Sequence, residues 1–246
     1  MDNLTISVAG GLRARAESLE LLAHNLANAS TAGFKADREL YRQYVSEAAA
    51  DGESRSAAIL PVVEGRWTDT SQGALVATGR NLDLAISGPG YFSILGPDGP
   101  LYTRDGSFRI SADGRLVTRD GYEVEVSAAG PDPVRLDPLR DVEISRTGAI
   151  RQGGIERGTI RVVEFSPGAQ NEKIPGNYFS FSGPQPITAR GAEVVQGYME
   201  QSNVSAPETA IRLINVMRQF EMLNRALSLG AEMNRRAVEE VARVPA

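Results

Sequence analysis

The first part of the chain has a helical pattern of hydrophobic residues. Leucines recur every seven positions, with one more placed three residues after the second of them, and alanines lie beside the series. Residues at this spacing lie on one face of an α-helix and form a stripe that a partner helix can cover. The pattern predicts an N-terminal helix that frays over 28–32 and stops at Gly33, which can adopt the left-handed conformation that ends a helix. Its hydrophobic stripe consists of Leu12, Leu19, Leu22 and Leu26.

The last part of the chain predicts a second, longer helix over roughly 206–242. Ser205 and Glu208 fit a capping box, in which each side chain accepts a hydrogen bond from the other residue's backbone N–H. Pro207 falls in the first turn, where a missing N–H donor costs little. The hydrophobic stripe of this helix has Leu213, Phe220 and Leu227 repeating every seven residues, with Met217 and Leu223 on adjoining stripes.

The middle of the chain reads as short strands instead. Asn81–Ile86 alternates between polar and apolar residues, as a half-buried strand does. Four Asp-Gly pairs separate the runs that follow, and Asp-Gly favours the tight turns of antiparallel hairpins. Further strands are expected at Tyr91–Leu95, Leu101–Thr103, Phe108–Ile110, Leu116–Thr118, Tyr122–Val126, Val142–Ile144, Ala149–Arg151 and Ile160–Phe165.

These patterns predict an α+β protein in which two long, coiled-coil-like terminal helices flank a mostly antiparallel β domain. The expected parts are an N-terminal helix in 1–38, an extended connector in 39–75, a β domain in 76–192 and a C-terminal helix in 193–246. Within them, 46–56 is Ala- and Ser-rich and reads as flexible, and 166–192 is rich in Gly, Pro and Ser and reads as irregular. Because neither helix has a local partner for its stripe, we expect the helices to pack on each other, on neighbouring molecules, or on both.

Composition excludes several classes of protein. The net charge of −5 argues against nucleic-acid binding, which needs a basic surface. The absence of Cys and the presence of a single His exclude disulfide scaffolds, thiolate metal sites and multi-His metal centres. No apolar run is long enough to cross a membrane, and the N-terminus lacks the charge pattern of a cleavable secretory signal.

No motif indicates catalysis, a metal or a cofactor. The Asp-Gly pairs do not have the spacing of a calcium-binding loop, so turn formation is the favoured interpretation. Pro89 removes a backbone donor from the one loop that resembles a phosphate site, and there is no nucleophile elbow. Asn25 and Asn28 allow two interpretations: their amides bond to a partner helix and fix its register, or they simply favour the end of a helix.

Three groups of residues resemble the motifs of flagellar axial proteins. The first resembles their N-terminal signature, the second their central motif, and the third the segment before their C-terminal helix. Met217–Glu221 also matches the arginine–aromatic–glutamate pattern within that helix. The three groups are His24–Lys35; Gln72–Leu75, Thr78–Gly79, Leu82–Phe92, Tyr102–Phe108 and Gly114–Thr118; and Gln196–Val204.

The resemblance implies a structural subunit of the flagellar basal-body rod, closer in length and connector to the proximal-rod kind than to the distal-rod kind. It implies export by the flagellar type III apparatus without a cleaved signal peptide, assembly in the periplasmic space with itself and other rod subunits, and no catalysis, cofactor, nucleic acid or membrane insertion. It also implies that the terminal helices pair as the inner layer of a helical tube that transmits motor torque. The competing interpretation is a soluble ligand-binding β domain with helical dimerisation arms. The expected assembly interface comprises Leu12, Leu19, Leu22, Asn25, Leu26, Asn28, Leu213, Met217, Phe220, Leu223 and Leu227.

Overall fold

The computed structural model describes residues 3–45, 59–130, 133–166 and 170–241, which divide into two compact units. Unit 1 comprises Met1–Ala27, Asp37–Asp69 and Ser205–Ala246. Unit 2 comprises Asn28–Ala36 and Thr70–Val204. The segment 46–56, expected to be flexible, lies outside the described residues.

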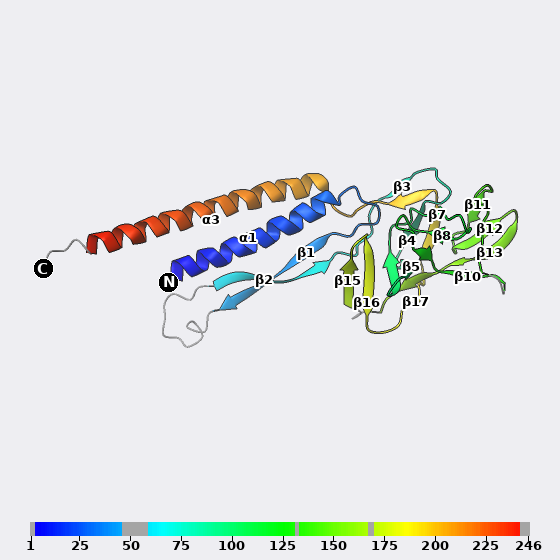
Figure 1. Ribbon diagram of the computed structural model, residues 1–246, viewed down its shortest axis with the longest axis horizontal. Coiled ribbons are helices and arrows are strands. Elements are labelled where there is room, and N and C mark those ends of the chain that lie inside the picture. Colours follow the sequence, from blue (N-terminus) through cyan, green and yellow to red (C-terminus); the bar gives the residue numbers. More distant parts are fainter. Residues whose placement is uncertain (1–2, 46–58, 131–132, 167–169, 242–246) are drawn as a thin grey trace. The chain divides into compact units, whose positions relative to one another are not determined.

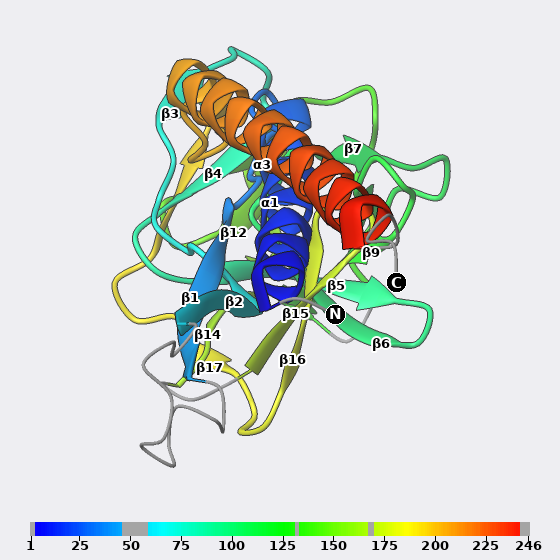
Figure 2. The same cartoon turned by 90° about the vertical axis from the view of Figure 1, so that its left-hand side faces the viewer.

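Unit 1 has three layers. Helix α1 (Asn3–Ala27) lies between helix α3 (Ala206–Val241) and a two-stranded antiparallel sheet of β1 (Asp37–Val45) and β2 (Ile59–Thr68), as Figures 1 and 2 show from two sides. Residues 39–75 were expected to be an extended connector. They contain most of β1 and all of β2, which pair with each other.

The ends of the two helices follow the expectations in part. Helix α1 stops at Ala27, and residues 28–33 form turns, so Gly33 adopts a left-handed φ of 64° without ending the helix. Helix α3 begins directly after Ser205, as expected. The carboxylate of Glu208 accepts a hydrogen bond from Arg212 at 2.7 Å, one turn further along the helix. Within the described residues, no helix has the length and apolar character needed to cross a lipid bilayer.

Unit 2 is built from antiparallel strands, so the fold is α+β as expected. The strands are β3 (Leu75–Ala77), β4 (Leu84–Ser87), β5 (Tyr91–Gly96), β6 (Gly99–Thr103), β7 (Arg109–Ile110), β8 (Leu116–Val117), β9 (Glu123–Val124), β10 (Val126–Ala128), β11 (Val142–Ile144), β12 (Ala149–Gln152), β13 (Ile155–Ile160), β14 (Val162–Glu164), β15 (Gln170–Ile174), β16 (Tyr178–Ser182), β17 (Ile187–Thr188), β18 (Glu193–Gln196) and β19 (Tyr198–Glu200). One sheet has the order β10-β13-β12-β11. A larger sheet has the order β15-β16-β6-β5-β9-β8-β7, with β14 and β17 branching from it. In addition, β18 pairs with β4, and β19 with β3.

The expectation of an irregular segment over 166–192 is wrong, because β15, β16 and β17 lie in it. Aromatic residues supply the reason. Phe179 is fully buried and its ring lies 5.5 Å from that of Tyr91, while Phe181 stacks on Phe165 at 3.5 Å. Aromatic packing of this kind stabilises strands even where Gly, Pro and Ser dominate the composition.

Three of the four Asp-Gly pairs form the expected hairpin turns. Gly99, Gly114 and Gly121 take φ values of 142°, 77° and 91°, and each joins two paired strands. Gly106 is different, because it lies between β6 and β7, which do not pair in the described sheets. A Cβ on Gly106 would lie 1.8 Å from the carbonyl oxygen of Leu84, so glycine is needed there for close backbone approach.

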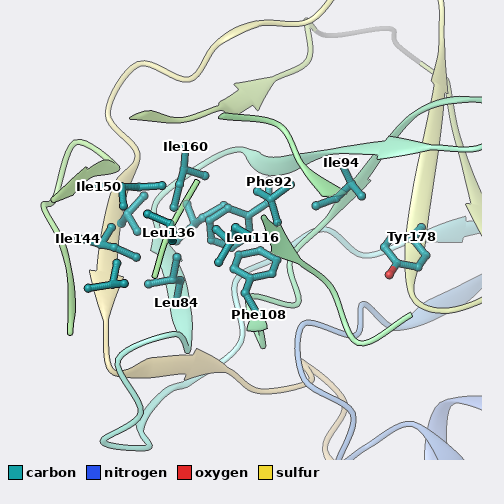
Figure 3. Close-up of a cluster of buried hydrophobic side chains, with 14 residues drawn as sticks. Leu84, Phe92, Ile94, Phe108, Leu116, Leu136, Ile144, Ile150, Ile160 and Tyr178 are labelled. Atoms are coloured by element: carbon teal, nitrogen blue, oxygen red, sulfur yellow. The ribbon is translucent and has the colours of Figure 1, made fainter. Parts of the chain in front are cut away.

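The core of unit 2 is a cluster of buried aliphatic and aromatic side chains (Figure 3). The rings of Phe92 and Phe108 meet edge to face at 5.1 Å, a favourable geometry for aromatic pairs. Leu136 joins the cluster from outside the strands, held by a backbone hydrogen bond to Gly114. Other labelled members are Leu84, Ile94, Leu116, Ile144, Ile150, Ile160 and Tyr178.

The close approach at Gly106 gives a test of the packing between β4 and the segment after β6. Gly106→Ala should lower the free energy of unfolding by about 1–3 kcal/mol, because the added methyl group overlaps a backbone oxygen that cannot move freely. Urea denaturation followed by circular dichroism measures the change. The matched control is Gly130→Ala, where the added Cβ would meet no atom of the described residues within 4 Å. Equal stability of the two variants would contradict this packing.

Candidate functional site

The segment that follows α1, Asn28–Ala36, is embedded in unit 2. Its last four residues, from Gly33 to Ala36, are buried. The backbone N–H of Gly33 donates to the carbonyl oxygen of Glu200 at 2.7 Å, and that of Ala36 donates to Oδ1 of Asn203 at 2.7 Å. The segment is therefore fixed through its backbone to the residues that lead from β19 towards α3.

A buried ion pair lies at the end of this segment. Nζ of Lys35 donates to Oε1 of Glu200 at 2.5 Å and to the carbonyl oxygen of Ser71 at 2.6 Å. Both charged side chains are 0% exposed. The same carboxylate oxygen accepts the backbone N–H of Gly73 at 2.9 Å. Such additional hydrogen bonds are what a buried charge needs to offset its loss of hydration.

Arg104 completes what we call the ion cluster, Lys35–Glu200–Arg104. One guanidinium nitrogen donates to Oε2 of Glu200 at 3.1 Å, and another donates to the carbonyl oxygen of Gly88 at 2.9 Å. The guanidinium also lies over the ring of Tyr91, 5.3 Å from its centroid. Burial raises the pKa of the Tyr91 hydroxyl above its ordinary value, although the nearby Arg104 charge opposes this. The tyrosine therefore stays neutral beside the cluster.

Both lysines of the chain lie at this site. Nζ of Lys173, from β15, donates to the carbonyl oxygen of Lys35 at 2.5 Å and lies 4.0 Å from the ring centroid of Phe34. Asn177, directly before β16, donates from its amide to the carbonyl oxygen of Ala32 at 2.7 Å. The chain uses arginine for every other basic side chain. A compact ammonium group with three donors suits a small buried site better than a planar guanidinium.

The ion cluster joins three parts of unit 2 that are distant in sequence. Lys35 belongs to the segment between α1 and β1, Ser71 and Gly73 follow β2, and Glu200 precedes α3. These are the parts of unit 2 that continue directly into the elements of unit 1. Each of the three charges is paired with protein groups, although Nε of Arg104 is buried without a hydrogen bond, so the cluster is suited to holding the chain in place rather than to acting on a substrate.

The cluster was not among the expected site residues, although a signal for it exists. Each of the three resembling motifs contributes one member: Lys35 ends the first, Arg104 lies in the second, and Glu200 lies in the third. A single charged residue in each of three separate motifs does not show that the three side chains are in contact in the folded chain. Only the pairing of β19 with β3 and the path of Asn28–Ala36 bring them together.

The four expected leucines of α1 are half-buried. The fully buried positions form a neighbouring stripe, Ala14, Ser18, Leu21 and Asn25. That stripe faces the β1–β2 sheet, because Asn25 bonds to the first residue of β1. Leu22 lies three turns from Gly11 on the same helix face, and the Cβ position of Gly11 is 3.5 Å from Leu223 of α3. Helix α1 is thus covered on two sides.

The expected stripe of α3 is covered except at one position. Leu213, Phe220, Leu223 and Leu227 are half-buried, whereas Met217 is 46% exposed. The covered positions follow one another at alternating spacings of four and three residues. After Leu213 the next covered position is therefore Val216 and not Met217. The positions in this series are Thr209, Leu213, Val216, Phe220, Leu223, Leu227 and Gly230.

Asn25 and Asn28 make hydrogen bonds to different segments of the chain. The amide of Asn25 donates to the carbonyl oxygen of Asp37 at 2.7 Å and accepts the Asp37 backbone N–H at 3.0 Å. It therefore fixes the start of β1 against the end of α1. Oδ1 of Asn28 accepts from the hydroxyl of Thr31 at 3.2 Å, in the turn after the helix.

The buried carboxylate gives a test of the ion cluster. Glu200→Gln should lower the free energy of unfolding by about 3–5 kcal/mol, because it leaves two buried cations facing a neutral amide of the same shape. Urea denaturation followed by circular dichroism measures the loss. The control is Glu193→Gln, whose 56% exposed side chain pairs with Arg146 at 3.6 Å and whose loss should change stability little. Similar losses in the two variants would show that the cluster does not stabilise the fold.

Comparisons with known proteins agree with this architecture. The family model described as "Flagellar hook protein FlgE/F/G D1 domain" matches residues 85–152, in the β domain. The model described as "Flagellar basal body rod FlgEFG protein C-terminal" matches residues 195–240, which span β19 and most of α3. These two matches contain Arg104 and Glu200 of the ion cluster.

Relatives that match over most of the chain are also flagellar basal-body rod proteins. The chain is 32% identical to the flagellar basal-body rod protein FlgF of Caulobacter vibrioides, over 99% of this chain and 100% of the relative. It is 35% identical to FlgF of Rhizobium meliloti, over 82% of this chain and 83% of the relative. It is 33% identical to the rod protein FlgG of Agrobacterium fabrum, over 92% of this chain and 94% of the relative. The chain therefore belongs to the family of flagellar basal-body rod proteins, FlgF and FlgG among them, and is a structural subunit rather than an enzyme.

Proposed function

We propose that the chain polymerises through α1 and α3 into the inner layer of a helical tube, with the β domain outside it, and that this tube transmits motor torque. The observation that carries the proposal is a row of exposed apolar side chains on α3. Its members are separated by eleven, seven and four residues, which places them on one helix face. We call this row the α3 outer stripe; it consists of Ile211, Met222, Leu229 and Met233, which are 61–71% exposed.

The two apolar faces of α3 have different roles in this proposal. The covered face, with Leu213, Phe220, Leu223 and Leu227, packs on α1 within one subunit beside Leu12, Leu19, Leu22 and Leu26. The α3 outer stripe and Met217 are covered only when another subunit binds. A helix that is apolar on two sides is typical of a buried position, and the described chain covers one side.

We assign the chain to the proximal, FlgF-type rod subunits in preference to the distal, FlgG-type ones. The support is the near-complete coverage of the Caulobacter FlgF and the identities of 32% and 35% to two FlgF relatives. FlgG relatives reach similar identities, so the preference is one of degree. Membership of the rod family also supports export by the flagellar type III apparatus, a periplasmic location in the basal body, and assembly with other rod subunits.

Association of the purified chain tests the proposal. The Leu229→Asp variant should keep the fold and stability of the parent, because the side chain is 61% exposed, and should lose self-association, because assembly would bury an unpaired charge. Sedimentation velocity over a range of concentrations measures association. Thermal unfolding followed by circular dichroism checks the fold.

The matched control is Asn224→Asp, which adds the same charge at an exposed polar position of the same helix. It should associate as the parent does. The alternative, a ligand-binding β domain with dimerisation arms, predicts one discrete dimer, whereas rod assembly produces a continuous series of oligomers. A parent chain that forms only closed dimers, or a Leu229→Asp variant that still forms the series, would contradict the proposal.

A further inference from the structure

The β1–β2 sheet has a second face that α1 does not cover. Side chains alternate between the two faces of a strand. Asp37 points towards α1, where its carboxylate lies 3.8 Å from Nδ1 of His24, and Arg66 points the same way, 3.3 Å from Glu20. The intervening residues therefore lie on the opposite side. We call this side the Trp67 face; its described members are Arg38, Leu40, Gly65 and Trp67, which form two cross-strand pairs.

The Trp67 face has the composition of a binding surface. Trp67, the single tryptophan of the chain, is 49% exposed, and Leu40 is 51% exposed. The guanidinium of Arg38 lies 6.0 Å from the centroid of the indole and is held there by Asp69 at 2.9 Å. Opposite Leu40 stands Gly65, and among the described residues no atom lies within 4 Å of the position its Cβ would take. Exposed tryptophan and arginine side chains are characteristic of interface hot spots.

We propose that the Trp67 face binds the α3 outer stripe of a second copy of this chain. The α3 outer stripe is the partner because its chemistry matches: Met222 and Met233 are flexible thioethers that adapt to an irregular surface and make favourable contacts with an aromatic ring. Leu229, between them in sequence, supplies a branched apolar side chain to pack over Gly65 beside Leu40.

The layer order of unit 1 supports the same partner. Helix α1 lies between α3 and the β1–β2 sheet (Figures 1 and 2). Because the α3 outer stripe and the Trp67 face both point away from α1, they are on opposite sides of the unit. A contact between unlike, opposite faces repeats from copy to copy and does not close. A contact of the Trp67 face with itself would close as a dimer, which does not build a tube. The inference rests on the proposed function, and it specifies which two faces meet.

Cross-linking between copies tests the contact directly, because the chain has no cysteine of its own. Leu40→Cys and Met222→Cys are made as separate full-length variants, one with an affinity tag, and both substitutions fall on exposed side chains. The two are mixed under associating conditions and treated with a short thiol-specific cross-linker. We expect mixed cross-linked dimers in the mixture and few in either variant alone. The matched control replaces Met222→Cys with Asn224→Cys, which lies on another face of α3 and should give several-fold less product.

The outcomes separate this contact from the proposed function. A chain that associates in an open series without preferential Leu40→Cys/Met222→Cys products overturns the contact and leaves the function in place. Abundant products of Leu40→Cys with itself would show a closed contact of two Trp67 faces and also overturn it. A chain that stays monomeric at every concentration overturns both the contact and the function.

A substitution on the sheet gives an independent readout. Leu40→Lys should weaken self-association at least about tenfold, since it places an unpaired ammonium group in the contact. In the parent, the fluorescence of Trp67 should shift to shorter wavelength as copies associate, and the variant should require a correspondingly higher concentration for the same shift. Unchanged association of the variant, or an emission maximum that does not move while the parent associates, would rule out the Trp67 face as the site.

Discussion

The carboxylate of Glu200 is the group on which the arrangement of unit 2 depends. It is fully buried, pairs with Lys35 on one oxygen and Arg104 on the other, and also accepts a backbone N–H from Gly73. A charge in such a place is tolerated only when every partner is in position, so the cluster penalises alternative arrangements more than it adds to stability. It fixes the points at which the chain leaves the β domain for the helices and the two-stranded sheet.

A different constraint organises unit 1. Its helices and its sheet have apolar faces that must be buried against other elements. Helix α1 is covered by α3 on one side and by the β1–β2 sheet on the other. The outer layers of the unit, α3 and the sheet, each retain exposed apolar side chains, such as Leu229 and Trp67. A subunit built this way packs around α1 and presents two unlike exposed surfaces, which another molecule covers in the proposed assembly. This asymmetry suits a building block for an open assembly.

The sequence pattern identified local elements well and long-range contacts poorly. The spacing of Leu213, Phe220 and Leu227 identified the covered face of α3, and the strand Val142–Ile144 was predicted to the residue. The expectation failed where the deciding contacts are distant in sequence: β1 with β2, or the aromatic packing that makes β16 a strand. Gly106 shows the same limit, since its Asp-Gly pair looks like a hairpin turn and its real constraint is the carbonyl of Leu84.

Periodicity, turn residues and resemblance to known motifs were therefore sufficient to determine the α+β class, the two terminal helices and the rod family, because each depends on residues close together in the chain. The ion cluster and the two exposed apolar faces of unit 1 were decided by the tertiary structure alone. Lys35, Arg104 and Glu200 come from three separate motifs, and a charge acquires its partner only when the backbone brings distant segments within hydrogen-bonding distance.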